Sequence, residues 1–268
     1  RDNSGNDATI NLPSPGSSNS LSAIKAIAIG GWKQQSYIKA VNNDPGDSFG
    51  NTISYENDTL VVAAAGEDSN QTTITNGTTA SSDNNLSGSG AVYVYRRSGT
   101  TWAQEAYIKA VNSDAGDSFG NSLSIDNDTL AVGALFEASN QTTITNGTTA
   151  SSNNDNTTSG AVYVYRRSGT TWAQEAYIKT ANNDANDGFS HRVISLDGDT
   201  LVVAATAEDS NQTTITNGTT ASSDNNLSAS GAVYVYRRSG TTWAQEAYIK
   251  AVNSDAGDSF GISLSIDN

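Results

Sequence analysis

Pairs of aspartates three residues apart are the residues of this chain best placed to bind a metal ion. Two carboxylates in a tight turn, together with nearby carbonyl groups, supply the oxygen ligands that Ca2+ prefers. The alternative interpretation is that each aspartate accepts hydrogen bonds from backbone N–H groups and thereby closes the turn, and we favour it. The candidate metal ligands are Asp44, Asp47, Asp114, Asp117, Asp255 and Asp258, and a similar pair occurs at Asp184 and Asp187.

N-linked glycosylation is a second chemistry that the sequence suggests, because Asn-x-Ser/Thr triplets recur at equivalent places. Several lie in the polar stretch SNQTTITNGTTASS, which occurs unchanged at 69–82, 139–152 and 210–223. Duplication alone explains this identity; the alternative is that every copy presents the same sugar-bearing or self-contacting surface. The candidate acceptors are Asn57, Asn70, Asn76, Asn85, Asn127, Asn140, Asn146, Asn156, Asn211, Asn217 and Asn226.

No set of residues stands out from the repeated pattern as catalytic, so we expect no enzyme activity and no catalytic residue. His191 is the only histidine and has no nucleophile signature beside it, which favours a turn or surface role. Arginine pairs recur at strand ends, where they are expected to bind neighbouring acidic residues rather than a ligand. These pairs are Arg96-Arg97, Arg166-Arg167 and Arg237-Arg238.

Composition narrows the class of protein. The chain has 268 residues and a formal net charge of -14, which argues against binding to nucleic acid or to an anionic membrane surface. It contains no apolar run long enough for a transmembrane helix, so no membrane insertion is expected. Few charges with much Asn, Thr and Ser favour an extracellular or cell-surface location.

The elements that carry these residues recur about every seventy residues. The tryptophans at positions 32, 102, 172 and 243 are 70, 70 and 71 residues apart. Each unit contains four strand-like runs, which in the second unit are 119–125, 129–135, 161–166 and 172–181. Four antiparallel strands that are apolar on both faces are typical of a propeller blade, in which each tryptophan packs between neighbouring blades.

The two ends of the chain supply complementary parts of one further blade. Residues 6–10, 22–29 and 32–41 resemble strands two to four, and 260–266 resembles a first strand. This predicts an all-β propeller of four blades with one blade split between the termini, closed either within one chain or between chains; part of a larger ring is the alternative. The expected units are 1–41, 42–111, 112–181 and 182–252, with 253–268 completing the split blade.

These motifs make the chain similar to FG-GAP repeat proteins of the bacterial type, and to the N-terminal propeller of integrin alpha chains. The resemblance rests on Phe49-Gly50, Phe119-Gly120 and Phe260-Gly261, whereas the third unit has Phe189-Ser190. The GAP element is degenerate and is best kept at Gly133-Ala134-Leu135. The resemblance implies an extracellular β-propeller, often in adhesion, and not an enzyme. The calcium loop DxDxDG of some integrin blades is missing from the sequence, so that calcium site is not carried over.

We therefore expect a non-catalytic extracellular structural or adhesive module that polymerises head-to-tail into a surface filament through its split blade. The alternative is a receptor domain that binds carbohydrate or protein with its Thr/Asn-rich loop face. The expected partners are thus the chain itself or a surface glycan or protein. No cofactor is expected apart from Ca2+ at the aspartate pairs.

Overall fold

The structure is a computed structural model that describes residues 33–267. The chain divides into two compact units, Arg1–Tyr37 and Ile38–Asn268, and all the strands described below belong to the second unit. The strands expected at 6–10 and 22–29 lie outside the described residues.

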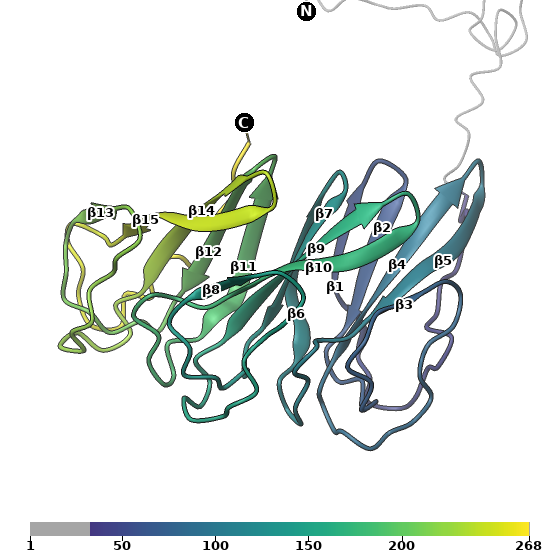
Figure 1. The fold of residues 1–268 in the computed structure, drawn as a ribbon, viewed down its shortest axis with the longest axis horizontal. Helices are drawn as coiled ribbons and strands as arrows, with labels where there is room; N and C mark the ends of the chain where they lie inside the picture. Colours follow the sequence, from purple (N-terminus) through teal and green to yellow (C-terminus); the bar gives the residue numbers. More distant parts are fainter. Residues whose placement is uncertain (1–32, 268) are drawn as a thin grey trace, which may run out of the picture. The chain divides into compact units, whose positions relative to one another are not determined.

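Three antiparallel sheets of five strands each make up the second unit and follow one another along the chain (Figure 1). Each has the same strand order, β1-β2-β4-β5-β3 in the first sheet. The first sheet contains β1 (Phe49–Glu56), β2 (Thr59–Ala64), β3 (Thr75–Asn76), β4 (Ala91–Ser98) and β5 (Thr101–Ile108). The second contains β6 (Phe119–Asp126), β7 (Thr129–Ala134), β8 (Ile144–Asn146), β9 (Ala161–Ser168) and β10 (Thr171–Ile178). The third contains β11 (Phe189–Asp197), β12 (Thr200–Ala205), β13 (Ile215–Asn217), β14 (Ala232–Ser239) and β15 (Thr242–Ile249).

The four strands predicted for each unit are present, but the prediction missed a fifth. The long polar loop forms a short edge strand, β8 in the second sheet, which pairs with β10 through Ile144 and Ile178. It escaped prediction because two or three residues among threonines and asparagines show no alternation of apolar and polar residues. The loop is therefore anchored to its own sheet.

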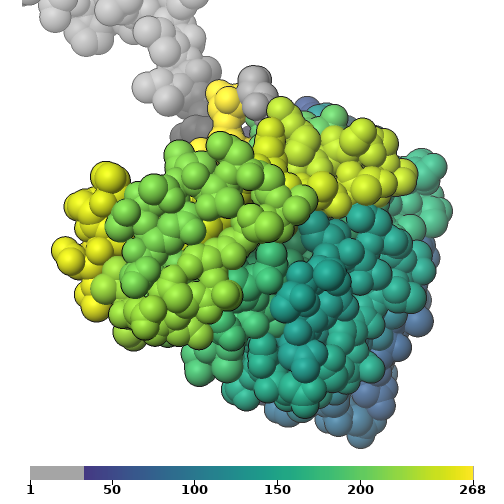
Figure 2. All heavy atoms as spheres, turned by 60° about the vertical axis from the view of Figure 1, so that its left-hand side comes forward, coloured from purple at the N-terminus to yellow at the C-terminus, as the bar shows by residue number. Residues whose placement is uncertain are grey.

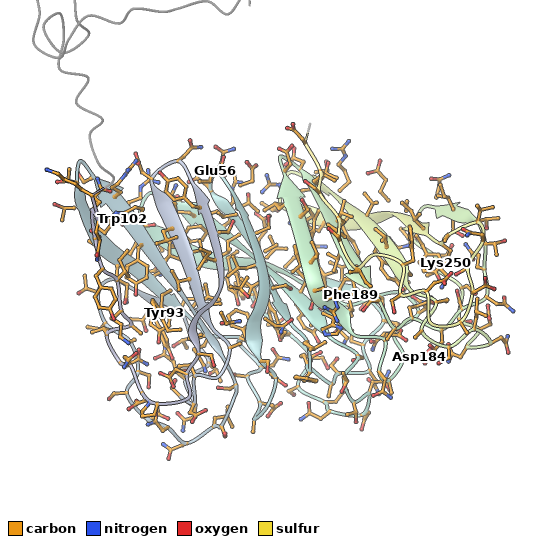
Figure 3. All side chains as sticks on the ribbon, turned by 180° about the vertical axis from the view of Figure 1, so that it is seen from behind. Glu56, Tyr93, Trp102, Asp184, Phe189 and Lys250 are labelled. Carbon is orange, nitrogen blue, oxygen red and sulfur yellow. The ribbon has the colours of Figure 1, made fainter. Side chains whose placement is uncertain are left out.

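Apolar residues on both faces of the central strands are buried and pack the sheets against one another. Figure 2 shows parts of the chain that follow one another in sequence lying in direct contact. One cluster joins residues of the first and second sheets, and another joins the second and third. Phe119 of the FG motif is fully buried and meets the Tyr163 ring edge-on, with 5.3 Å between ring centres. Phe189 has the same place between the second and third sheets (Figure 3).

Small residues make this close packing possible. They also explain two departures from the FG-GAP pattern, namely an alanine in place of the GAP glycine at position 63 and a serine in place of the FG glycine at position 190. We call the packed boundary between two successive sheets a joint. At the first joint, between the first and second sheets, a Cβ added to Gly120 would lie 2.8 Å from the Cβ of Ala63. At the second joint the pair is reversed, because a Cβ on Gly133 would lie 2.7 Å from the Oγ of Ser190. The serine that replaces the FG glycine is thus accommodated by the glycine that its neighbouring sheet has kept.

The C-terminal segment follows the path of a next first strand without being one. Its residues 260–267 form a turn, a bend and irregular chain, whereas a strand was expected at 260–266. The N–H of Phe260 nevertheless donates to the carbonyl of Ser230 at 2.9 Å, as Phe119 does to Ser89 and Phe189 to Ser159. A strand needs a ladder partner, and the described residues contain no second strand beside this segment.

The fourth strand expected at 32–41 is likewise not formed in its described part, since residues 33–40 carry no strand. The strands expected to pair with it lie among the residues that the structure does not describe. The split blade therefore remains a prediction.

Candidate functional site

A tryptophan clamp holds each sheet to the next and is the most distinctive repeated arrangement of polar groups in the structure. The Asn76 side chain on β3 accepts a hydrogen bond from the backbone N–H of Trp172 at 2.7 Å and donates one to its carbonyl at 3.2 Å. Asn146 on β8 binds Trp243 with the same two distances. The short edge strand that was not predicted from the sequence is therefore the element that forms hydrogen bonds with the neighbouring sheet.

Each clamped indole is also held by a glutamate and an arginine. Trp172 Nε1 donates to Glu105 Oε1 at 3.0 Å, and the Arg167 guanidinium lies 5.5 Å from the centre of the indole ring. Arg167 also pairs with Glu105 at 3.4 Å and with Asp128 at 2.6 Å. Such cation–π and charge-assisted contacts strengthen when they are shielded from water. The predicted roles of the tryptophans and of the second arginine of each pair are confirmed at these joints.

The same residues at the two outer sheets form only half of a clamp. The Glu246 side chain is 52% exposed, whereas Glu105 and Glu175 are each 8% exposed. Ile215 beside Asn217 is 58% exposed, and Asn217 makes no side-chain hydrogen bond with any residue in 33–267. The third sheet thus presents the asparagine and the glutamate of a clamp without a tryptophan between them; we call this the acceptor half.

The first sheet presents the tryptophan and the arginine of a clamp, which we call the donor half. The Arg97 side chain is 32% exposed, against 9% for Arg167 and Arg238, and Trp102 is only partly buried. Trp102 lies on the outward side of the first sheet (Figure 3), with Arg97 5.7 Å from its ring centre. The unfilled groups of the first and third sheets are therefore complementary.

A buried ion pair lies at the end of every sheet, between residues that follow two of its strands, and was not predicted from the sequence. Lys179 Nζ donates to Glu137 Oε2 at 2.9 Å, and Tyr177 donates to Glu137 Oε1 at 2.9 Å. The Lys179 side chain is fully buried, and desolvation lowers the pKa of its ammonium group while Glu137 opposes that shift. The equivalent pairs are Lys109–Glu67 and Lys250–Glu208. The recurrence of Tyr-Ile-Lys at the end of the fourth predicted strand was the available signal, but burial of this lysine depends on contacts between distant segments.

The second residue of each aspartate pair closes a turn. Asp117 Oδ2 accepts the backbone N–H of Asp114 at 2.9 Å, and the pairs 44/47, 184/187 and 255/258 have the same bond. Burial raises the pKa of Asp117 to about 7 and that of Asp187 to about 8. Residues 33–267 contain no group of three or more His, Cys, Asp or Glu side chains arranged to hold a metal ion. The geometry is that of turn closure, the alternative that we favoured, and Ca2+ at Asp44, Asp47, Asp114, Asp117, Asp255 and Asp258 stays a prediction.

The aspartate turns and the long loops lie at the same end of the sheets. Asn154 of the loop donates to Asp114 Oδ2 at 3.1 Å. Asp184 lies at the opposite end of the sheets from Glu56 (Figure 3).

The candidate glycosylation sites differ in whether their side-chain nitrogen is free. Asn76 and Asn146 use that nitrogen in the tryptophan clamp, so a glycan there would require an open clamp. Asn156 donates to the carbonyl of Asn183 at 2.9 Å. Asn217 is exposed, although it occupies the same position in the repeated loop as the two clamped asparagines. Glycosylation itself stays a prediction.

His191 is only partly buried and lies 3.5 Å from the hydroxyl of Thr206. Desolvation and the neighbouring Arg192 lower the pKa of its imidazole. His191 thus lies near the start of β11, beside the segment that follows β12.

Antiparallel sheets packed face to face in chain order define a propeller-type array of blades. The profile of the FG-GAP repeat matches residues 32–95 and 102–165. The chain therefore contains FG-GAP repeats, as its motifs predicted. No curated protein matches the chain. Within the described part of the chain, no helix is long and apolar enough to cross a membrane.

Proposed function

We propose that this protein is a non-catalytic, extracellular structural or adhesive module that assembles head-to-tail through its split blade. FG-GAP repeats are typical of extracellular propellers, which supports the location. The observation that carries the assembly is the pair of half-clamps: on the third sheet Asn217 is exposed, and Glu246 is 52% exposed and, within residues 33–267, pairs only with Arg237 of its own sheet, at 3.6 Å. Unlike surfaces that bind head-to-tail without closing generate an open array.

The residue proposed to fill the open half is the tryptophan of the split blade, Trp32, supplied by a second copy. It precedes Trp102 by the same 70 residues that separate Trp102 from Trp172. In this arrangement the segment 260–266 lies beside residues 6–41 of the next copy, and the two together complete a blade.

Among residues 33–267, the repetition of the same polar arrangements from sheet to sheet supports a non-catalytic role. Apart from His191, the titratable groups described above serve clamps, ion pairs and turns, and each arrangement recurs in several sheets. Catalysis requires groups placed around one reacting centre rather than copied along an array.

Light scattering after size-exclusion chromatography, over a range of protein concentrations, tests the assembly. The wild-type chain is expected to form oligomers whose mass rises with concentration, with filaments visible by electron microscopy. Asn217→Ala combined with Glu246→Gln is expected to shift the chain toward monomer. A wild-type monomer at every concentration, with lower stability in the variant, would indicate closure within one chain and contradict the assembly.

A further inference from the structure

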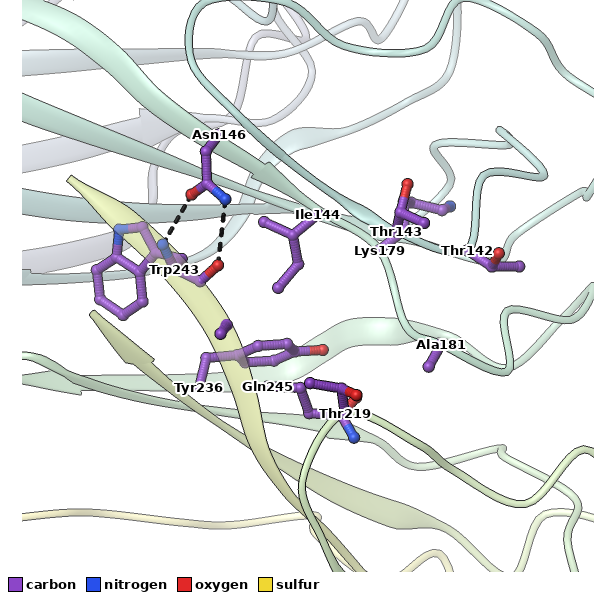
Figure 4. Close-up of a pocket in the computed structure, with 11 residues that line it drawn as sticks. Thr142, Thr143, Ile144, Asn146, Lys179, Ala181, Thr219, Tyr236, Trp243 and Gln245 are labelled. Carbon is purple, nitrogen blue, oxygen red and sulfur yellow. Dashed lines mark hydrogen bonds between the residues drawn. The ribbon is translucent and has the colours of Figure 1, made fainter. Parts of the chain in front are cut away.

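A small pocket opens at each joint, beside the tryptophan clamp and under the Thr-rich loop. The one between the second and third sheets has a volume of about 360 Å³ and is lined by Thr142, Thr143, Ile144, Thr219 and Gln245 among others (Figure 4). Its counterpart between the first and second sheets measures about 280 Å³. Sites for small molecules usually occupy about 300–1,000 Å³, so the larger pocket falls at the lower end of this range and the smaller one just below it, as suits a compact ligand.

A buried hydroxyl without a partner lies on the wall of each pocket. Tyr236 lines the larger pocket and Tyr165 the smaller one, and their side chains are 0% and 1% exposed. Neither phenolic oxygen has a hydrogen-bond partner, and neither does Oε1 of Gln174 in the smaller pocket. In Figure 4 the Tyr236 hydroxyl points into the space near Thr219 and Gln245. Buried polar groups nearly always find a partner, so these atoms point to a ligand that the protein itself does not provide.

The equivalent tyrosine of the first sheet is satisfied by the protein. Tyr95 donates its hydroxyl to the carbonyl of Lys39 at 3.3 Å. The unpartnered state is therefore a property of the two joints and not of this tyrosine position in every sheet.

The pocket offers polar groups without an available charge. Lys179 is its one charged lining residue, and its ammonium group is committed to Glu137 at 2.9 Å, to Ser159 at 2.7 Å and to the carbonyl of Gly160 at 2.7 Å. The rest are hydroxyls, amides and apolar groups, beside the indole of Trp243. A neutral ring that carries several hydroxyl groups matches this lining, because it can both donate and accept while covering the apolar wall.

We propose that each joint binds one neutral sugar unit, with Tyr236 or Tyr165 donating to it and the threonines of the loop closing over it. The long loop supplies Thr142 and Thr143 to the larger pocket and Thr72 and Thr73 to the smaller one. Recognition by this surface gives the unchanged loop sequence a role beyond duplication. The inference goes beyond the proposed assembly and does not depend on it, since both pockets lie within one chain.

Saturation-transfer NMR on the intact chain with methyl glucoside, methyl galactoside and N-acetylglucosamine tests the site. At least one is expected to bind with a millimolar dissociation constant, whereas glucuronate and glucosamine bind at least about tenfold more weakly because the pocket offers no free counter-charge. The combined variant Tyr165→Phe and Tyr236→Phe is expected to lose about tenfold in affinity with no fall in melting temperature, because no protein partner is lost. Tyr95→Phe is the matched control and should bind as the wild type does.

Three results would overturn the proposal. One is saturation transfer to none of the neutral sugars, and another is equal affinity of the wild type and the double Tyr→Phe variant. The third is binding of a Thr-rich peptide in place of every sugar, which would identify the pockets as a protein-recognition site.

Discussion

At the scale of single residues, the copies of one unit act as controls for each other. Asn146 grips the backbone of Trp243 with two hydrogen bonds, whereas Asn217, at the same place one sheet later, has no such partner. The two asparagines have the same neighbours in sequence and differ only in whether a tryptophan of a following sheet is present.

The clamp is expected to contribute to stability only where it is closed. Asn146→Ala should lower the free energy of unfolding by about 1–3 kcal/mol, because it leaves buried backbone groups of Trp243 unpaired. Asn217→Ala should change it by less than about 0.5 kcal/mol under conditions where the chain is monomeric. Urea unfolding followed by tryptophan fluorescence measures both, and equal effects of the two variants would refute the clamp.

Burial of Asp117 predicts a dependence of stability on pH. Its pKa is raised from the usual 3.8 to about 7, so between these values the folded protein retains a proton that the unfolded chain has lost. Stability must then fall as the pH rises through this window, by at most about 1.4 kcal/mol per pH unit from this group.

Asp117→Asn isolates this effect, because asparagine keeps an oxygen that accepts the Asp114 N–H. The variant should gain stability relative to the wild type as the pH is raised from 4 to 7, and the difference should stay level above pH 7. Thermal unfolding at several pH values measures the difference. A constant difference from pH 4 to pH 8 would contradict a raised pKa.

At the scale of elements, each joint depends on one small residue facing another. Gly133 of β7 faces Ser190 of β11, while the first joint has Ala63 facing Gly120. Gly133→Ala should cost about 1–3 kcal/mol by overpacking. Ser190→Gly in that background should recover part of the loss, because it removes the contact with Ser190 Oγ at 2.7 Å, whereas the closer contact with Ser122 Oγ remains. Denaturant unfolding of the double-mutant cycle measures the coupling, and simple additivity of the two substitutions would contradict this packing.

The main strands were predictable from the sequence, and the joints were not. The run AVYVYR alternates small and aromatic residues and is flanked by turn residues, so it indicates a strand that is covered on both faces. Nothing local distinguishes Asn146 from the other asparagines of its loop, since its role depends on a tryptophan 97 residues away. The buried pair of Lys179 and Glu137 was missed because both residue types are normally exposed and the two residues lie far apart in the sequence.

At the scale of the whole molecule, the chain repeats one joint twice and displays its two halves on the outer sheets. Within the chain the joint buries Trp172 and Trp243 to 1% exposure each. If the same chemistry operates between copies, the interface has a direction, because the acceptor Asn217 and the proposed donor Trp32 belong to different parts of the chain. Such an interface can be disrupted by a substitution in either of its two unlike surfaces.

A mixing experiment tests this central claim most directly. Trp32→Ala removes the proposed donor and Asn217→Ala removes the acceptor, so each variant alone should be monomeric by light scattering. An equimolar mixture should form a one-to-one dimer, because Asn217 of the first variant and Trp32 of the second still make one intact joint, and it should not grow further. A mixture that stays monomeric, or variants that assemble alone as the wild type does, would contradict head-to-tail assembly through the tryptophan clamp.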